Sequence, residues 1–80
     1  MFILVGEGRY IRADEVVSVA DLKTFIHSDY KELEKQGLVI IDVTGGKTPC
    51  SIIFMKNNTA FVCAMLAKTV MNRIADTEKR

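Results

Sequence analysis

A glycine-rich turn bearing one lysine is the part of the sequence with the clearest chemical potential. Gly46, Lys47 and Thr48 match the end of a P-loop, in which backbone N–H groups and a lysine surround the phosphates of a nucleotide. A P-loop also needs a glycine five positions earlier, where this chain has Ile41, and a helix directly afterwards, where it has Pro49. The segment is therefore predicted to be a turn between two strands, with a single basic side chain at its tip.

Residues that could serve in catalysis or metal binding are few and scattered. The chain has one histidine, His27, and two cysteines, Cys50 and Cys63. Their spacing matches no zinc-ligand set, and no serine or cysteine nucleophile stands in a catalytic motif. No two acidic residues are spaced for acid–base work. We therefore expect no enzyme activity, no cofactor, no metal and no small-molecule substrate, with both cysteines present as reduced thiols.

Three basic side chains lie at predicted turns and strand ends, and they are candidates for contacts to phosphate. Arg9 and Arg12 flank a short strand, whereas Lys47 lies on the glycine turn with the hydroxyls of Thr44 and Thr48 beside it. Cations, hydroxyls and backbone N–H groups are the usual partners of nucleic-acid phosphates. The alternative that these residues leave open is that they are ordinary solvated surface charges.

The elements that would position these residues follow from apolar patterning and turn signals. Strands are predicted at residues 2–5, 9–12, 15–20, 38–43, 51–56 and 59–65, with an Asn57–Asn58 hairpin turn between the last two. Helices are predicted at 30–36, ended by Gly37, and at 67–78. A weaker helical pattern places Leu22, Phe25 and Ile26 on one face ahead of residue 30, where Ser28 or Asp29 is the expected cap. This order predicts an α+β fold: a small, mostly antiparallel β-sheet with one inserted helix and one C-terminal helix, in a single domain of residues 1–80.

The composition is strongly apolar for so short a chain. Of 80 residues, 49% are hydrophobic and 26% are charged, with a net charge of +1. A domain of this size hides only about 60% of its unfolded surface, so the surplus predicts a subunit interface. We expect a homo-oligomer whose interface draws on Phe54, Phe61, Val62, Val70, Met71 and Ile74. The sequence shows neither a leader pattern nor an apolar run of membrane-spanning length, so we expect a cytoplasmic protein without a membrane partner.

A series of short motifs spans nearly the whole chain in a recognisable order. They are Val5-Gly6-x-Gly8, Ile11-x-Ala13-Asp14-x-Val16-Val17, Asp42-x-Thr44-x-Gly46, Thr48-Pro49-x-Ser51 and Thr69-x-x-x-Arg73. In this order they resemble the RemA/RemB family of small regulators of extracellular-matrix (biofilm) genes. The last two motifs are more similar to the RemB branch.

That resemblance implies an α+β subunit that closes into a ring-like homo-oligomer. In the RemA branch, DNA winds around the outside of such a ring and is held by arginines. A few cations repeated around a ring would neutralise several phosphates, which gives salt-dependent binding with little base readout. This chain departs from the RemA pattern at the expected contacts, because Glu15, Thr48 and Cys50 stand where that branch has arginine. Lys47 keeps one charge but lacks the planar fork of arginine.

Two functions of different classes follow from these observations. The first is a DNA-associated transcriptional regulator of matrix genes that acts through Lys47, Thr48, Arg9 and Arg12. The second is an oligomeric protein-interaction module that keeps the fold and does not bind DNA. A small-molecule sensor at the Gly45–Gly46 turn is a third hypothesis. A continuous basic belt would favour DNA, whereas a mixed or acidic rim would favour protein partners.

Overall fold

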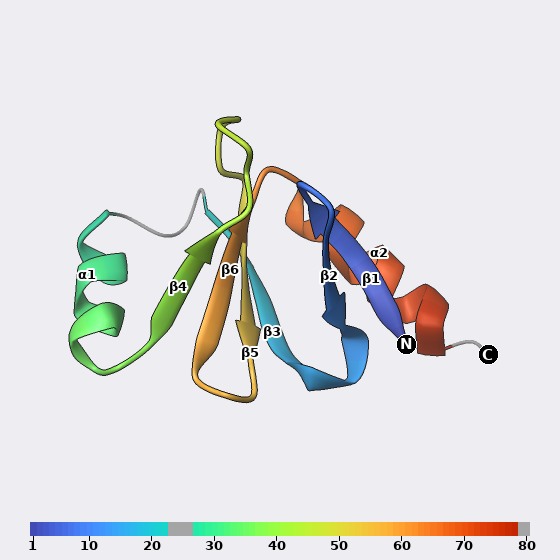
Figure 1. Ribbon diagram of the computed structural model, residues 1–80, viewed down its shortest axis with the longest axis horizontal. Helices are drawn as coiled ribbons and strands as arrows, with labels where there is room; N and C mark the ends of the chain where they lie inside the picture. The colour runs from blue at the N-terminus through green and yellow to red at the C-terminus, as the bar shows by residue number, and fades with distance from the viewer. Residues whose placement is uncertain (23–26, 79–80) are drawn as a thin grey trace.

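Six strands and two α-helices make up the described part of the chain (Figure 1). The computed structural model describes residues 1–22 and 27–78, with side chains for residues 1–22 and 31–77. In chain order the elements are β1 Phe2–Gly6, β2 Arg9–Arg12, a 3₁₀ helix Ala13–Glu15, β3 Val16–Asp21, α1 His27–Lys35, β4 Val39–Asp42, β5 Ser51–Met55, β6 Thr59–Cys63 and α2 Ala67–Glu78. The predicted α+β class is confirmed.

The strands form two sheets where the sequence predicted one (Figure 1). β1 and β2 pair with each other as an antiparallel hairpin, and the other strands form a sheet in the order β3-β5-β6-β4. β5 runs antiparallel to both of its neighbours, whereas β4 is parallel to β6. The arrangement is therefore mostly antiparallel, as predicted. The 3₁₀ helix after β2 redirects the chain, so that the hairpin stacks against the larger sheet and does not extend it.

The main core lies between the hairpin, one face of the four-stranded sheet and α2. Side chains alternate along each strand, so the hairpin turns one row of apolar residues inward. The buried members of this core are Ile3, Val5, Ile11, Ala13, Val43, Ile53, Met55, Phe61, Cys63 and Val70. Full burial of one large aliphatic side chain contributes about 1.5–3 kcal/mol. This core therefore holds the hairpin and α2 to the sheet.

The two central strands of the larger sheet bury both of their faces. Ile52, Ala60 and Val62 form a second cluster on the opposite face, with Ile40 and Phe54 partly buried against it. Strands that are covered on both faces are expected to be apolar along their whole length. This explains why residues 51–55 and 59–63 form nearly continuous apolar runs.

The sequence predicted the end of α1 more accurately than its start. Gly37 has φ +96°, and its N–H and that of Leu38 donate to the carbonyls of Glu34 and Leu33 at 3.0 and 3.1 Å. This is a Schellman motif, so the predicted C′ glycine is confirmed. α1 begins at His27, ahead of the predicted start. The cap residues and the side chain of His27 lie outside the described side chains, and the pattern at residues 23–26 lies outside the described residues.

Candidate nucleic-acid interface

Two glycine turns meet at one end of the molecule and create the candidate site. The first is the β1–β2 turn, and the second is the segment 44–47, called here the Lys47 turn, in which the Lys47 N–H donates to the Thr44 carbonyl at 3.3 Å. A Cβ atom on Gly6 would lie 2.5 Å from the Val43 carbonyl oxygen, and one on Gly45 would overlap the Glu7 side chain. Glycine at these positions is therefore what allows the two turns to touch.

A local hydrogen-bond network braces the Lys47 turn from beneath. The Asp42 carboxylate accepts from the Thr44 N–H at 2.8 Å and from the Thr44 hydroxyl at 2.7 Å. These two bonds favour the charged form, so they lower the pKa of Asp42 from its ordinary value of 3.8. Thr44 is buried, and its hydroxyl is already engaged. It therefore supports the turn and is not free to meet a phosphate.

Replacing Thr44 with valine is expected to raise the pKa of Asp42 back towards its ordinary value. The variant keeps the backbone N–H bond and the side-chain shape but removes the hydroxyl donor. Because the folded-state pKa is depressed, this bracing is present above the ordinary pKa and is lost as pH falls through the folded value. Titration of the Asp42 carboxyl carbon by NMR in both proteins measures the change. An unchanged pKa would contradict the assigned role of the hydroxyl.

Lys47 and Thr48 are exposed on a loop that projects beyond the end of the larger sheet (Figure 1). Within the described part of the chain, Lys47 forms no ion pair. A hollow of about 210 Å³ lies beside it, lined in part by Gly6, Glu7 and Met65. The Lys47 ammonium and the Thr48 hydroxyl are therefore open to a large partner.

The structure does not bring the two arginines of β2 to the same face. Ile11 pairs with Ile3 and is buried, so Arg9 lies on the inner side of the hairpin and Arg12 on the outer side. The Arg9 guanidinium stands over the Phe61 ring, 5.5 Å from its centroid, which is cation–π geometry. Arg9 is exposed at the same end of the hairpin as the Gly6 turn, whereas Arg12 is at the other end.

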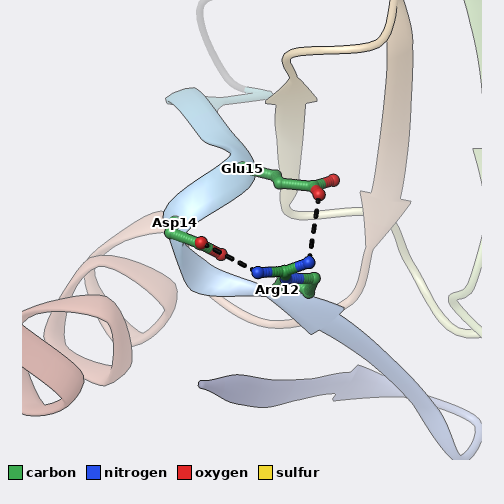
Figure 2. A network of polar contacts seen from close by, with 3 residues as sticks. All are labelled: Arg12, Asp14 and Glu15. Atoms are coloured by element: carbon green, nitrogen blue, oxygen red, sulfur yellow. Dashed lines mark hydrogen bonds and ion pairs between the residues drawn. The ribbon is translucent and has the colours of Figure 1, made fainter.

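Arg12 is held by two carboxylates (Figure 2). One guanidinium nitrogen lies 3.1 Å from Asp14 Oδ2 and the other lies 3.8 Å from Glu15 Oε1. The three side chains are substantially exposed, so the pairs contribute little to stability. They nevertheless place two negative charges around one positive charge. Arg12 is therefore a poor phosphate contact, which leaves Lys47, Thr48 and Arg9 as the candidates at the turn end.

A comparison with protein families identifies the family of this chain. The model of the RemA-like family, described as extracellular matrix regulatory protein A-like, matches residues 2–74. The chain belongs to the RemA-like family. The description names a regulatory protein concerned with the extracellular matrix, not an enzyme. A comparison with curated proteins gives no significant match.

The residues predicted for an interface occupy different environments in this RemA-like chain. Val70 is fully buried, Phe61 and Val62 are nearly so, Phe54 and Ile74 are partly buried, and Met71 is 50% exposed. Most of this set therefore packs against other residues of the same chain. The reason is that both faces of β6 and one side of α2 are already covered by the chain itself.

A different apolar surface is exposed on the outer face of the hairpin. Phe2 pairs with Arg12 and Leu4 pairs with Tyr10, so these side chains share the face opposite the core. Phe2 is 63% and Tyr10 60% exposed, and Leu4 is 37% exposed. Sequence reasoning missed this surface, although the run of apolar residues on both parities of β1 was a usable signal.

Other chemistry is limited in the described residues. No group of three or more His, Cys, Asp or Glu side chains gathers there as metal ligands would. Cys50 and Cys63 are both free thiols, and Cys63 Sγ lies 2.9 Å from the Ser51 hydroxyl in a buried contact. None of the described helices has the length and apolar character needed to span a bilayer.

Proposed function

We propose that this RemA-like protein is a DNA-associated transcriptional regulator of extracellular-matrix genes that acts in the cytoplasm as a ring-like homo-oligomer. The observation that carries the proposal is an exposed lysine on a projecting glycine turn in a member of a matrix-regulator family. We also propose that the chain is closer to the RemB branch, on the strength of its Thr48-Pro49-x-Ser51 and Thr69-x-x-x-Arg73 motifs.

The exposed hairpin face supports the oligomer. Phe2, Leu4 and Tyr10 form a contiguous apolar patch on a two-stranded sheet whose other face is buried in the core. Such patches generally mark association surfaces. A small hairpin that contacts a second subunit through this face would be covered on both sides. The oligomer would also repeat the single Lys47 charge around its circumference, which compensates for the near-neutral chain.

Replacing Phe2 with aspartate is expected to dissociate the oligomer while the subunit stays folded. The Phe2 side chain is mostly exposed in the subunit, but an unpaired carboxylate would be desolvated at a subunit contact. Light scattering across micromolar concentrations measures the mass of the assembly. Val17→Asp is the matched control, because Val17 is also 63% exposed and lies on β3, outside the hairpin patch. A stable assembly with Phe2→Asp would argue against this face.

We propose that Lys47 touches DNA phosphates and not base edges. It stands on a short turn next to Gly46, where φ is +84° and nothing lies within 4 Å of a hypothetical Cβ atom. The open backbone allows a duplex to approach closely, and a single ammonium on such a turn supplies charge without a fixed fork. Arg9 and the Thr48 hydroxyl lie at the same end and would add contacts. Binding of this kind responds to salt more than to sequence.

Replacing Lys47 with alanine is expected to weaken binding to all DNA sequences alike and to flatten its salt dependence. Each neutralised phosphate contributes a slope of about −0.9 to the plot of log affinity against log salt. The slope should therefore become shallower by about that amount for every phosphate that Lys47 neutralises in the parent protein. Gel-shift titrations at several salt concentrations measure both quantities. Lys56→Ala is the control, because Lys56 is exposed at the β5–β6 turn, at the opposite end of the sheet.

A protein-interaction module is the second candidate, and one observation favours it. Asp14 and Glu15 neutralise Arg12 beside the apolar hairpin face, so that face has the mixed character of a protein contact (Figure 2). Absence of DNA binding even at low salt, with the oligomer confirmed by light scattering, would make this module the better interpretation.

A further inference from the structure

Thr48 differs from the other hydroxyl-bearing residues in its surroundings. Its side chain is exposed in the irregular segment 48–50, and its hydroxyl makes no hydrogen bond to a described residue. The other described hydroxyls are buried, engaged within the fold or part of a regular strand or helix: Tyr10, Ser18, Thr44, Ser51, Thr59, Thr69 and Thr77. Among described residues, Thr48 therefore has the most accessible hydroxyl outside regular structure.

The backbone around Thr48 suits capture by an enzyme that acts on a protein side chain. The loop between β4 and β5 projects beyond the sheet (Figure 1), and Thr48 lies beside an open hollow of about 250 Å³ that Leu22 and Leu66 also line. Pro49 disfavours the helical region for the residue before it, and residues 48–50 have no regular secondary structure. An irregular surface segment with an exposed hydroxyl is accessible to an enzyme that modifies protein side chains.

We propose that Thr48 is a phosphorylation site and that its modification switches off the phosphate contact of the Lys47 turn. This inference rests on the proposed function for its effect on DNA, but not for the site itself. The donor is ATP, and the catalyst is a protein kinase that accepts threonine. The Thr48 Oγ–phosphorus bond forms while the bond from the γ-phosphorus to its bridging oxygen breaks. ADP leaves, and the hydroxyl proton passes to a base of the kinase.

Phosphorylation of Thr48 would add more negative charge than the single positive charge of the Lys47 turn can neutralise. A phosphothreonine carries about −1.5 to −2 charges at neutral pH and has three acceptor oxygens. Lys47 precedes it directly and carries one positive charge, so the modified turn becomes negative overall. The new phosphate competes with DNA for the Lys47 ammonium and also repels the DNA backbone. A ring would repeat this reversal in every modified subunit.

The site itself is tested by mass spectrometry of the protein isolated from its own host, from cultures with and without matrix production. Trypsin cleavage after Lys47 places Thr44 and Thr48 on different peptides. Where phosphorylation blocks this cleavage, fragment spectra show which of the two threonines carries the phosphate. We expect phosphate on Thr48 and none on Thr44, which is buried and bonded to Asp42. Absence of phosphate on Thr48 in both cultures would overturn the proposal.

The effect is tested with full-length protein that carries phosphothreonine at position 48. The unphosphorylated parent protein serves as the baseline, because it differs from the modified protein only in the phosphate. We expect the phosphorylated protein to bind duplex DNA roughly tenfold or more weakly than the unphosphorylated protein at low salt, because like charges across an interface are strongly unfavourable. Gln36→Glu adds a negative charge at an exposed position before β4, at the end of that strand away from the Lys47 turn, and should leave binding unchanged.

The outcomes separate this inference from the proposed function. Equal DNA binding by the phosphorylated and the unphosphorylated protein would overturn the switch while leaving the regulator function in place. Phosphate on Thr48 in a protein that never binds DNA would overturn the proposed function and the switch, while the modification site would stand. Light scattering on the same samples shows whether the assembly stays intact, so that a change in binding is not a change in oligomeric state.

Discussion

Replacing Gly6 with alanine is expected to destabilise the subunit by about 2–4 kcal/mol. Gly6 has φ +146°, a region that side chains rarely adopt, and such strain costs on the order of 1–3 kcal/mol. The new Cβ would also lie 2.5 Å from the Val43 carbonyl oxygen, so the backbone of one turn must shift. For a domain of this size, each kcal/mol lowers Tm by roughly 4–8 °C. Thermal unfolding followed by circular dichroism should therefore show a fall of about 10 °C or more.

The same turn offers a control that separates strain from steric conflict. Gly8 has φ +70°, and a Cβ atom there would meet nothing within 4 Å. Gly8→Ala should therefore lower the free energy of unfolding only by the strain of the left-handed backbone, about 1–2 kcal/mol. If the two variants unfold at the same temperature, the close contact between the two turns does not explain the glycine at position 6. Because Val43 leads into the Lys47 turn, Gly6→Ala should also disturb that turn, whereas Gly8→Ala should not.

Local sequence signals predicted the turns and element ends well, because each depends on a few neighbouring residues. Gly37 ends α1 through a Schellman motif, as its position predicted. Asn57 and Asn58 form the β5–β6 turn, and Asn58 adopts φ +63° as its residue type allows. The apolar runs likewise located all six strands to within two residues at each end.

Contacts between distant segments were beyond these signals. Nothing in the sequence near Gly6 indicates that it must pass close to Val43, or that Glu7 packs over Gly45. The division into two sheets depends on how the hairpin stacks, and apolar alternation does not report which sheet a strand joins. The basic residues illustrate the same limit, because Arg9 and Arg12 are close in sequence yet lie on opposite faces.

Burial within the chain itself explains why the predicted interface residues differ from those of the exposed apolar patch. Hydrophobic residue types mark positions that must be covered, but they do not say whether the same chain or a second copy covers them. Phe61 is covered by the β1–β2 hairpin of the same chain and by the Arg9 guanidinium. Phe2, by contrast, is exposed on the outer face of that hairpin. Only the packed structure separates the two cases.

Replacing Val70 with aspartate is expected to abolish cooperative folding. Val70 is fully buried among the residues of the main core, where a carboxylate finds no partner. Burial of an unpaired charge costs several kcal/mol even after relaxation. The total stability of an 80-residue chain is roughly 4–12 kcal/mol, so this one change removes a large part or all of it. Urea denaturation should show no native baseline, or a midpoint far below that of the parent protein.

The neighbouring position on the same helix gives the matched comparison. Met71 is 50% exposed, so Met71→Asp places its carboxylate in water and should change the free energy of unfolding by no more than about 1 kcal/mol. A folded Val70→Asp with an unchanged midpoint would contradict the packing of α2 against the core. The pair also bears on the proposed oligomer. An assembly that dissociates in Val70→Asp would report an unfolded subunit, whereas one that dissociates in a folded Met71→Asp would report a contact between subunits through the exposed side of α2.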